Sequence, residues 1–294
     1  MTSTNEKKID LKQSIDFIRI LIYAAIVGLG AGVLGTLFTF SVNYVTQLRT
    51  NYPWLIYFLP IGGIVIVLLY KLAKYKDAGT DLVINSIHSE PHLPVRIGPL
   101  IFISSVITHL FGGSAGREGA ALQIGGSVGS FVSKTFRLTE EDKKTLIMSG
   151  MSGCFSALFG TPLTAAILPL EVVHVGYMEY AALLPCAIAS LVGHSVAIAM
   201  NLVEPMHHIG TVPNLDAITT LAVIGLSLLA GLVSRLFVFS LHKTHHIFAM
   251  IENAYVRAII GGAIIIILTL LVGNQDYNGV GSQMIERSLS GNVP

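Results

Sequence analysis

The sequence predicts an all-α protein that crosses a membrane several times, and three observations carry this prediction. Hydrophobic residues make up 52% of the 294-residue chain and charged residues only 12%, whereas about a quarter of the residues of a soluble domain are charged. The mean hydropathy is +0.70. The apolar residues form runs long enough to span a bilayer, and glycine and proline interrupt several of them. A soluble globular fold is therefore excluded.

The first two spans also predict the orientation of the chain. Residues 1–16 form a polar tail that contains three lysines, and Ile20 to Val45 then carries no charge over 26 residues, which is enough to cross a bilayer with some tilt. Trp54 opens a second apolar run that ends at Tyr70 and is followed by three more lysines. Because lysine and arginine gather on the cytoplasmic side, we expect a cytoplasmic N-terminus in the plasma membrane.

Later apolar segments are shorter or broken. Residues 97–111 and 180–203 read as helices, and Thr139 precedes three acidic residues, a pattern typical of a helix start. Residues 145–170 are apolar but contain Gly160-Thr161-Pro162, which predicts that one helix ends and another begins at Pro162. Pro169 is expected to kink or shorten this second helix. Interrupted helices at membrane depth are tolerated where they are buried in protein or line a cavity.

The most informative stretch runs from Thr108 to Gly126. Arg117 and Glu118 are the only charged residues between Arg96 and Lys134, and a charge at the bilayer centre costs roughly 2.5–3.5 kcal/mol on insertion scales. Glycines 112, 113, 116 and 119 favour a non-helical approach to a helix over residues 120–131. Backbone N–H groups and the positive end of that helix would then face an anion, or the Glu118 carboxylate in its place. The alternative, glycines that only allow close helix packing, leaves Arg117 and Glu118 unexplained.

An internal repeat divides the chain. Residues 32–41 match 231–240 at an offset of 199, and the same offset aligns 61–63 with 260–262 and Asp77 with Asp276. Such repeats, with a site near the midplane, build many transporters. We expect a polar tail (1–16), a first repeat (17–213) and the start of a second (214–294). The counterpart of Glu118 would lie beyond Pro294, so we expect an incomplete second repeat and no anion conduction by the chain alone.

At this point the motifs resemble a known family. Gly116-Arg117-Glu118-Gly119 resembles the GREG motif of the CLC chloride channels and transporters, and residues 153–171 resemble that family's following segment. Residues 108–119 are most similar to the bacterial branch that exports fluoride against protons. The resemblance implies a CLC-like bundle of inverted repeats with broken helices, and a homodimer with one pore per subunit. It further implies that Glu118 gates the pathway by taking up and releasing a proton.

The resemblance also marks departures from the family pattern. Thr80 stands where a serine of the family binds the central anion, and Gly116, Arg117 and Gly119 complete the implied site with Glu118. Val172 occupies the position at which coupled chloride exchangers carry an intracellular proton glutamate. The implied function is halide transport, with proton-coupled fluoride export favoured and chloride next. A passive chloride channel is the alternative.

The other candidate functional residues also have simpler structural explanations. Glu171, at the end of an apolar helix, and His109, one turn before the glycines, are possible secondary residues, although an interfacial carboxylate and a packed histidine explain them equally well or better. Gly150-Met151-Ser152-Gly153 fits the GxSG pattern of intramembrane serine proteases, with His174 or His194 as the base, a remote alternative without its structural context.

The remaining composition indicates what the protein does not use. A net charge of +1 with no basic stripe argues against nucleic acid as a partner. Histidines 242, 245 and 246 share a helix face but lack nearby acidic or thiol ligands, so we expect a solvated cluster and neither a metal nor a cofactor. Cys154 and Cys186 lie in apolar runs and read as buried small hydrophobic residues. We expect a non-enzymatic protein whose partners are halide, protons and the lipid bilayer.

Overall fold

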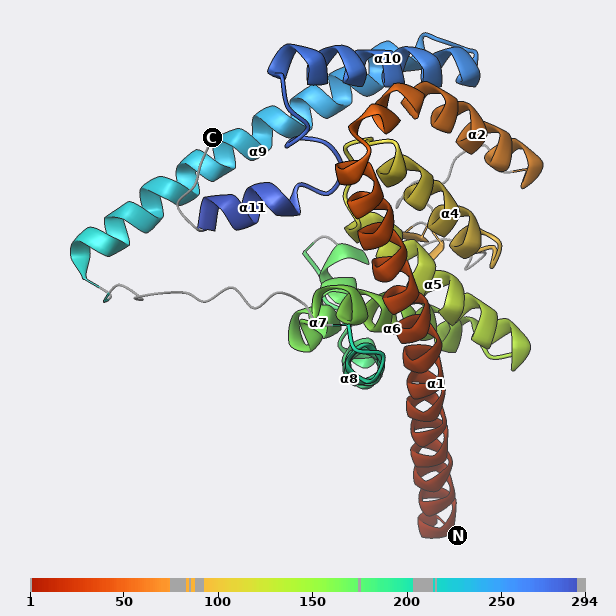
Figure 1. Ribbon diagram of the computed structural model, residues 1–294. Helices are drawn as coiled ribbons and strands as arrows, with labels where there is room; N and C mark the ends of the chain where they lie inside the picture. Colours follow the sequence, from red (N-terminus) through yellow and green to blue (C-terminus); the bar gives the residue numbers. More distant parts are fainter. Residues whose placement is uncertain are drawn as a thin grey trace.

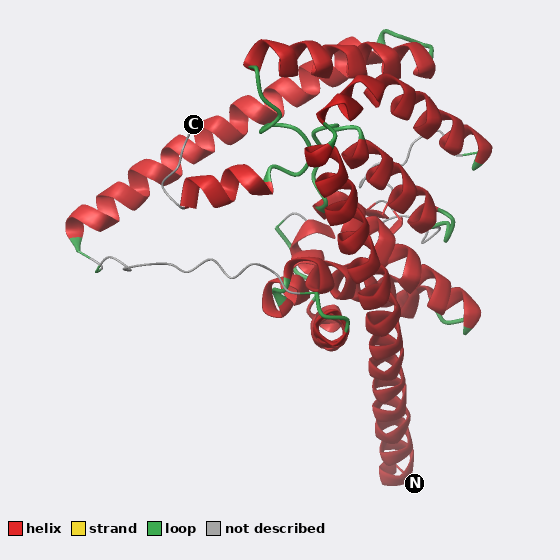
Figure 2. Cartoon of the chain, in the orientation of Figure 1, coloured by secondary structure: helices red, strands yellow, loops and turns green. Residues whose placement is uncertain are grey.

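The computed structural model describes residues 2–74, 83–84, 86–87, 93–173, 176–202, 214 and 216–289, and the statements below concern these residues. This part of the chain is helical and contains no strand (Figures 1 and 2). The helices are α1 (Thr2–Asn51), the 3-10 helix η1 (Pro53–Phe58), α2 (Leu59–Leu72), α4 (Ile97–Leu110), α5 (Glu118–Thr135), α6 (Glu140–Phe159), α7 (Pro162–Val173), the 3-10 helix η2 (Tyr180–Ala182), α8 (Leu183–Ala199), α9 (Ala217–Ala249), α10 (Ala254–Val272) and α11 (Ser282–Leu289).

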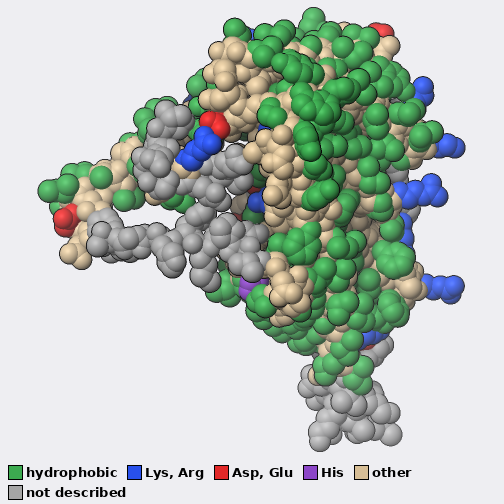
Figure 3. All heavy atoms as spheres, viewed as in Figure 1, with side chains coloured by type: hydrophobic (Ala, Val, Ile, Leu, Met, Phe, Trp, Pro, Cys, Tyr) green, Lys and Arg blue, Asp and Glu red, His purple; other side chains and the backbone are tan. Residues whose placement is uncertain are grey.

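Five helical segments of the described chain are long and apolar enough to cross a membrane. They cover Ser14–Asn51, Pro53–Leu72, Tyr180–Ala199, Ala217–Ala249 and Ala254–Val272, and α4 and α7 are shorter apolar helices. Hydrophobic side chains cover most of the face seen in Figure 3, while Lys and Arg side chains project along one edge. The expectation of an all-α multi-pass membrane protein is confirmed.

Helices α5 and α6 form the centre of the molecule because glycines let their backbones touch. A Cβ atom on Gly125 would overlap the carbonyl of Gly150, and one on Gly129 would overlap the carbonyl of Leu146. The buried core residues Ile124, Ile147 and other members of one hydrophobic cluster pack around this contact. Close approach through small residues is how helices associate where water does not drive packing. It also fixes the direction of α5, whose first residue is Glu118.

Helices α1 and α8 pack on α6 by the same means. Gly28 of α1 faces the carbonyl of Ala189 in α8, which an added Cβ would approach to 2.6 Å. Gly153 of α6 lies against both Gly28 and Gly193. Farther along α1, Phe38 is fully buried and contacts Phe102 of α4 edge-on, with ring centroids 5.4 Å apart. The long helix α1 therefore crosses the first repeat and holds α4, α6 and α8 together (Figure 1).

The predicted second repeat contacts the predicted first repeat where α10 crosses α2. A Cβ on Gly262 would lie 2.8 Å from the backbone nitrogen of Pro60, and one on Gly63 would lie 3.0 Å from the Cβ of Ala258. One glycine from each pair that the repeat offset aligns therefore lies at the contact between α2 and α10. Helix α9 has no buried residue. Asp216 caps it by accepting a hydrogen bond of 2.7 Å from the Thr219 amide, which lowers the pKa of this exposed carboxyl below its usual value.

Several helix boundaries differ from the sequence expectations. Helix α1 is continuous from Thr2 to Asn51, so the polar tail is the first part of this helix rather than a separate segment. Thr139 caps α6 by accepting from the Asp142 amide at 3.2 Å, which confirms the predicted helix start. The break before Pro162 is also confirmed, since α6 ends at Phe159 and is followed by the C-cap residue Gly160, whose φ is +65°. Pro169 does not end α7, which continues to Val173.

Candidate functional site

Residues 111–117, called the glycine turn below, separate α4 from α5, as the sequence predicted. Gly112, at a φ of +79°, donates its N–H to the carbonyl of His109 at 3.2 Å, and Gly113 donates to that of Thr108 at 2.8 Å. This pair of bonds is the Schellman motif, which needs a residue in the left-handed region just after the helix. Glycine meets that requirement without steric penalty. Residues 113–117 then run without helical structure to the start of α5.

Glu118 is the first residue of α5, and its carboxylate lies beside the start of this helix. No side chain caps this N-terminus, where Arg117 is the N-cap residue. The Oε2 atom of Glu118 folds back over Gly116, in the space that a Cβ on that glycine would occupy. Free N–H groups and the helix dipole favour a negative charge at such an end. The exposed carboxylate therefore sits where a dissolved anion of similar charge would be stabilised.

Arg117 turns away from Glu118 toward the second helix break. Its guanidinium carbon lies 5.7 Å from the ring centroid of Phe159, the last residue of α6, and its Nε atom is buried without a hydrogen-bond partner. No ion pair joins Arg117 to Glu118 in the described chain. The two adjacent charged side chains therefore do not pair with each other. Adjacent residues at a helix start point in different directions, and the aromatic face attracts the cation.

The other sequence candidates lie elsewhere or contribute differently. Thr80 falls outside the described residues. His109 is fully buried, with Nδ1 2.7 Å from the carbonyl of Ser105 and Nε2 without a partner. Glu171 is exposed near the end of α7, and no described contact links it to the glycine turn. Histidines 242, 245 and 246 are exposed on α9, and no group of three metal-ligating side chains occurs among the residues described. Cys154 and Cys186 are buried, as predicted.

Ser152 has a structural role that the protease alternative did not foresee. Its hydroxyl is fully buried and lies 2.7 Å from the carbonyl of Ala165 and 2.9 Å from that of Cys186. Ala165 stands four residues before Pro169, so its carbonyl has no helical N–H to accept from. The Ser152 hydroxyl replaces that missing donor, which explains why α7 continues through the proline. No described histidine contacts Ser152, whereas a nucleophilic serine needs a base within hydrogen-bond reach.

Replacing Ser152 with alanine is expected to destabilise the fold. The buried Ala165 carbonyl would lose its donor, which costs about 1–3 kcal/mol. The midpoint of unfolding in a sodium dodecyl sulfate titration should fall accordingly, while Ser195→Ala, which removes an exposed hydroxyl bonded within α8, should leave it within error. An unchanged midpoint for Ser152→Ala would contradict this structural role.

Sequence reasoning missed three residues that hold the glycine turn in place. Asn278 donates from Nδ2 to the carbonyl of Gly112 at 3.0 Å, Ser114 donates from Oγ to the carbonyl of Tyr277 at 2.7 Å, and Arg49 donates from Nη2 to the carbonyl of Asn278 at 3.3 Å. Arg49 had a usable signal, since it follows directly on a long charge-free run. Asn278 had none, because nothing in its neighbourhood distinguishes it from a surface turn.

The fold and this site define a class of protein: a multi-pass membrane protein in which two helix breaks meet and an uncapped helix start faces a carboxylate. Within that class, a model of the family described as voltage gated chloride channel matches residues 61–294. The chain belongs to this family. This confirms the resemblance that was inferred from the GREG motif at residues 116–119.

Individual relatives agree with this membership. A chloride/fluoride channel protein of Pseudomonas syringae pv. tomato is 36% identical over 260 residues, which are 87% of this chain and 58% of that protein. The H(+)/Cl(-) exchange transporter ClcA of Vibrio campbellii is 30% identical over 168 residues, 52% of this chain and 36% of that protein. The chain thus spans little more than half the length of the first of these relatives, and about a third of the second is matched.

Two solved structures share the fold. The crystal structure of a CLC-type fluoride/proton antiporter superposes with a TM-score of 0.90 at 29% identity, over 95% of this chain and 71% of that one. A slow cyanobacterial Cl-/H+ antiporter superposes with a TM-score of 0.70 at 22% identity, which concerns the fold alone. The CLC-like fold expected from the sequence is confirmed.

Proposed function

We propose that this chain carries the first-repeat half of a CLC-type halide pathway, with fluoride exported in exchange for protons and chloride as the next candidate substrate. The observation that carries the proposal is the Glu118 carboxylate folded over Gly116 at the uncapped start of α5. A carboxylate in this place competes with a dissolved anion for the same backbone donors. Protonation removes its charge, so that it releases the position and the anion enters.

The relatives support fluoride and protons as the substrates. The structure superposed at a TM-score of 0.90 is described as a fluoride/proton antiporter, and the relative from Pseudomonas syringae is named for chloride and fluoride. Because this relative is named a channel protein, a passive halide channel is the second candidate function. The proposed site consists of Glu118, Arg117, the backbone of Gly116 and Gly119, and Thr80.

Flux measurements separate these alternatives. We join this chain to the C-terminal part of the Pseudomonas syringae relative and reconstitute the protein in liposomes. A proton gradient should then drive fluoride against its concentration gradient. Dissipative fluoride or chloride flow that ignores the proton gradient would favour the passive channel, and an absence of halide flow would overturn the proposal. The same measurement on the 294-residue chain alone tests the expectation that it does not conduct.

The proposed setting is the plasma membrane, with a cytoplasmic N-terminus and a homodimer as the assembly. If the two repeats are inverted, α1 and α9 run in opposite directions across the bilayer. Single cysteines placed at Asn5 and at Asp216, each in a background with both native cysteines replaced, should therefore react with a membrane-impermeant reagent from opposite sides. Labelling of both positions from the same side would contradict the inverted arrangement.

A further inference from the structure

The connection between α10 and α11 lies against the glycine turn that precedes Glu118 (Figure 1). Asn278 is 6% exposed and donates from Nδ2 to the Gly112 carbonyl at 3.0 Å, and its side chain also hydrogen-bonds with the Thr269 hydroxyl at 3.2 Å. One residue earlier in the connection, Tyr277 accepts from Ser114 Oγ at 2.7 Å. These two bonds run in opposite directions and hold the turn on both sides of Gly113.

Arg49, at the end of α1, fixes this connection in turn. It is 6% exposed, and its guanidinium donates to the Asn278 carbonyl at 3.3 Å and to Oε1 of Gln275 at 3.4 Å. In the part of the chain that the structure describes, no carboxylate forms an ion pair with it. A buried cation that has only neutral acceptors keeps them firmly, because losing them leaves the charge unsolvated. The connection is thereby anchored to the first repeat.

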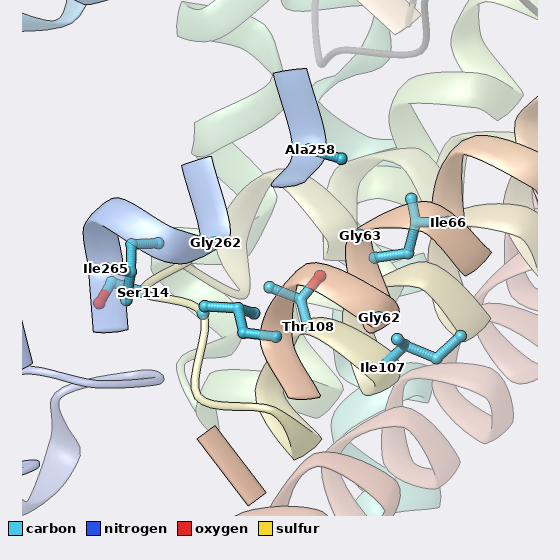
Figure 4. Close-up of a pocket in the computed structure, with 11 residues that line it drawn as sticks. Gly62, Gly63, Ile66, Ile107, Thr108, Ser114, Ala258, Gly262 and Ile265 are labelled. Carbon is cyan, nitrogen blue, oxygen red and sulfur yellow. The ribbon is translucent and has the colours of Figure 1, made fainter. Parts of the chain in front are cut away.

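Packing alone does not hold the turn. A cavity of about 170 Å³ adjoins Gly113 and Ser114, between α2, α4 and α10. Figure 4 shows Ser114 beside Ile265 at one end of this cavity and Thr108 farther inside it, with glycines 62, 63 and 262 leaving the space open. A turn with empty space on one side can shift, because no atoms there resist the movement. Its position therefore depends on the hydrogen bonds to residues 277 and 278.

We propose that Asn278 is a positioning residue for the halide site, through which the second repeat sets the geometry of the first-repeat turn. The proposal rests on the proposed function, since it concerns the same backbone donors at Gly116 and Gly119. The repeat offset that pairs Asp77 with Asp276 also pairs Gly79 with Asn278. The residues that correspond by this offset to the segment of Thr80 therefore contact the turn that leads to Glu118.

The test compares Asn278→Ala, Asn278→Asp and the control Asp276→Asn in the purified protein in which this chain is joined to the C-terminal part of the Pseudomonas syringae relative. The aspartate variant keeps the size and the acceptor of Asn278 but loses the donor to Gly112. The control changes the same connection, where Asp276 binds Arg287 at 2.9 Å and does not contact the turn. Amide hydrogen exchange of residues 111–119 is measured in each protein, together with fluoride and chloride binding by equilibrium dialysis with ion-selective electrodes.

Both Asn278 variants should speed exchange in residues 111–119 and raise the halide dissociation constant about tenfold, since one hydrogen bond to a buried carbonyl is lost. Exchange in residues 120–135 of α5 and in α6, and the number of halide sites, should stay the same, as in the control. A purely structural role would instead reduce the fraction of binding-competent protein at an unchanged dissociation constant.

Unchanged exchange and affinity in both Asn278 variants would overturn the positioning role, as would an equal effect of Asp276→Asn. If the joined parent protein binds neither halide, the proposed function fails. The exchange measurement still decides whether Asn278 holds the turn.

Discussion

Replacing Glu118 with glutamine is expected to abolish the proton dependence of halide flux. The amide has nearly the shape of the carboxylate but neither takes up nor releases protons. Because it also lacks the negative charge, the uncapped start of α5 no longer holds it against a competing anion. In liposomes that contain the chain joined to the C-terminal part of the Pseudomonas syringae relative, fluoride should flow down its gradient at a rate independent of pH, without proton movement in return.

The matched control for this prediction is Glu252→Gln. Glu252 is an exposed carboxylate in the turn between α9 and α10, so its replacement removes one negative charge without touching the glycine turn. Its pH profile should follow that of the parent protein. A Glu118→Gln protein that retains the parental pH profile would exclude Glu118 from the gating role.

Replacing Gly150 with valine is expected to prevent the first repeat from folding. A Cβ at this position would overlap the Gly125 carbonyl and would lie 3.2 Å from the Gly129 nitrogen. Neither backbone atom can move without separating α5 from α6, on which the core is built. Overpacking typically costs about 1–3 kcal/mol where side chains can adjust, and a backbone clash should exceed that range. The monodisperse peak in size-exclusion chromatography should be lost, and with it the site that α5 carries.

The chain provides a matched control for this glycine as well. Gly225 lies inside α9, and a Cβ there would meet no atom within 4 Å. Gly225→Val makes the same chemical change in a helix, where valine has a slightly higher helix propensity than glycine, so it should not reduce stability. A folded, monodisperse Gly150→Val protein would show that α5 and α6 do not approach as closely as the structure indicates.

The glycines show which structural roles could be predicted from the sequence and which could not. Its pattern predicted the turn at Gly112 correctly, because a helix that stops before two glycines has few alternatives. The close-packing explanation, set aside for the stretch as a whole, is nevertheless right for Gly125, which touches Gly150. One residue type serves both purposes, and the difference depends on which backbone lies opposite. The same holds for Ser152, whose motif suggested a nucleophile and whose neighbours show a donor to a carbonyl freed by Pro169.

The sequence by itself determined the membrane class, the two helix breaks, the repeat and the position of Glu118 at a helix start. These features follow from hydropathy, backbone preference and charge, which act over a few neighbouring residues. Only the tertiary structure decided that Arg117 faces Phe159 and that Asn278 braces Gly112, a residue 166 positions away in the chain. Such contacts depend on how the surfaces of distant helices fit together, and a turn residue such as Asn278 has the same local pattern whether it is exposed or holds a buried carbonyl.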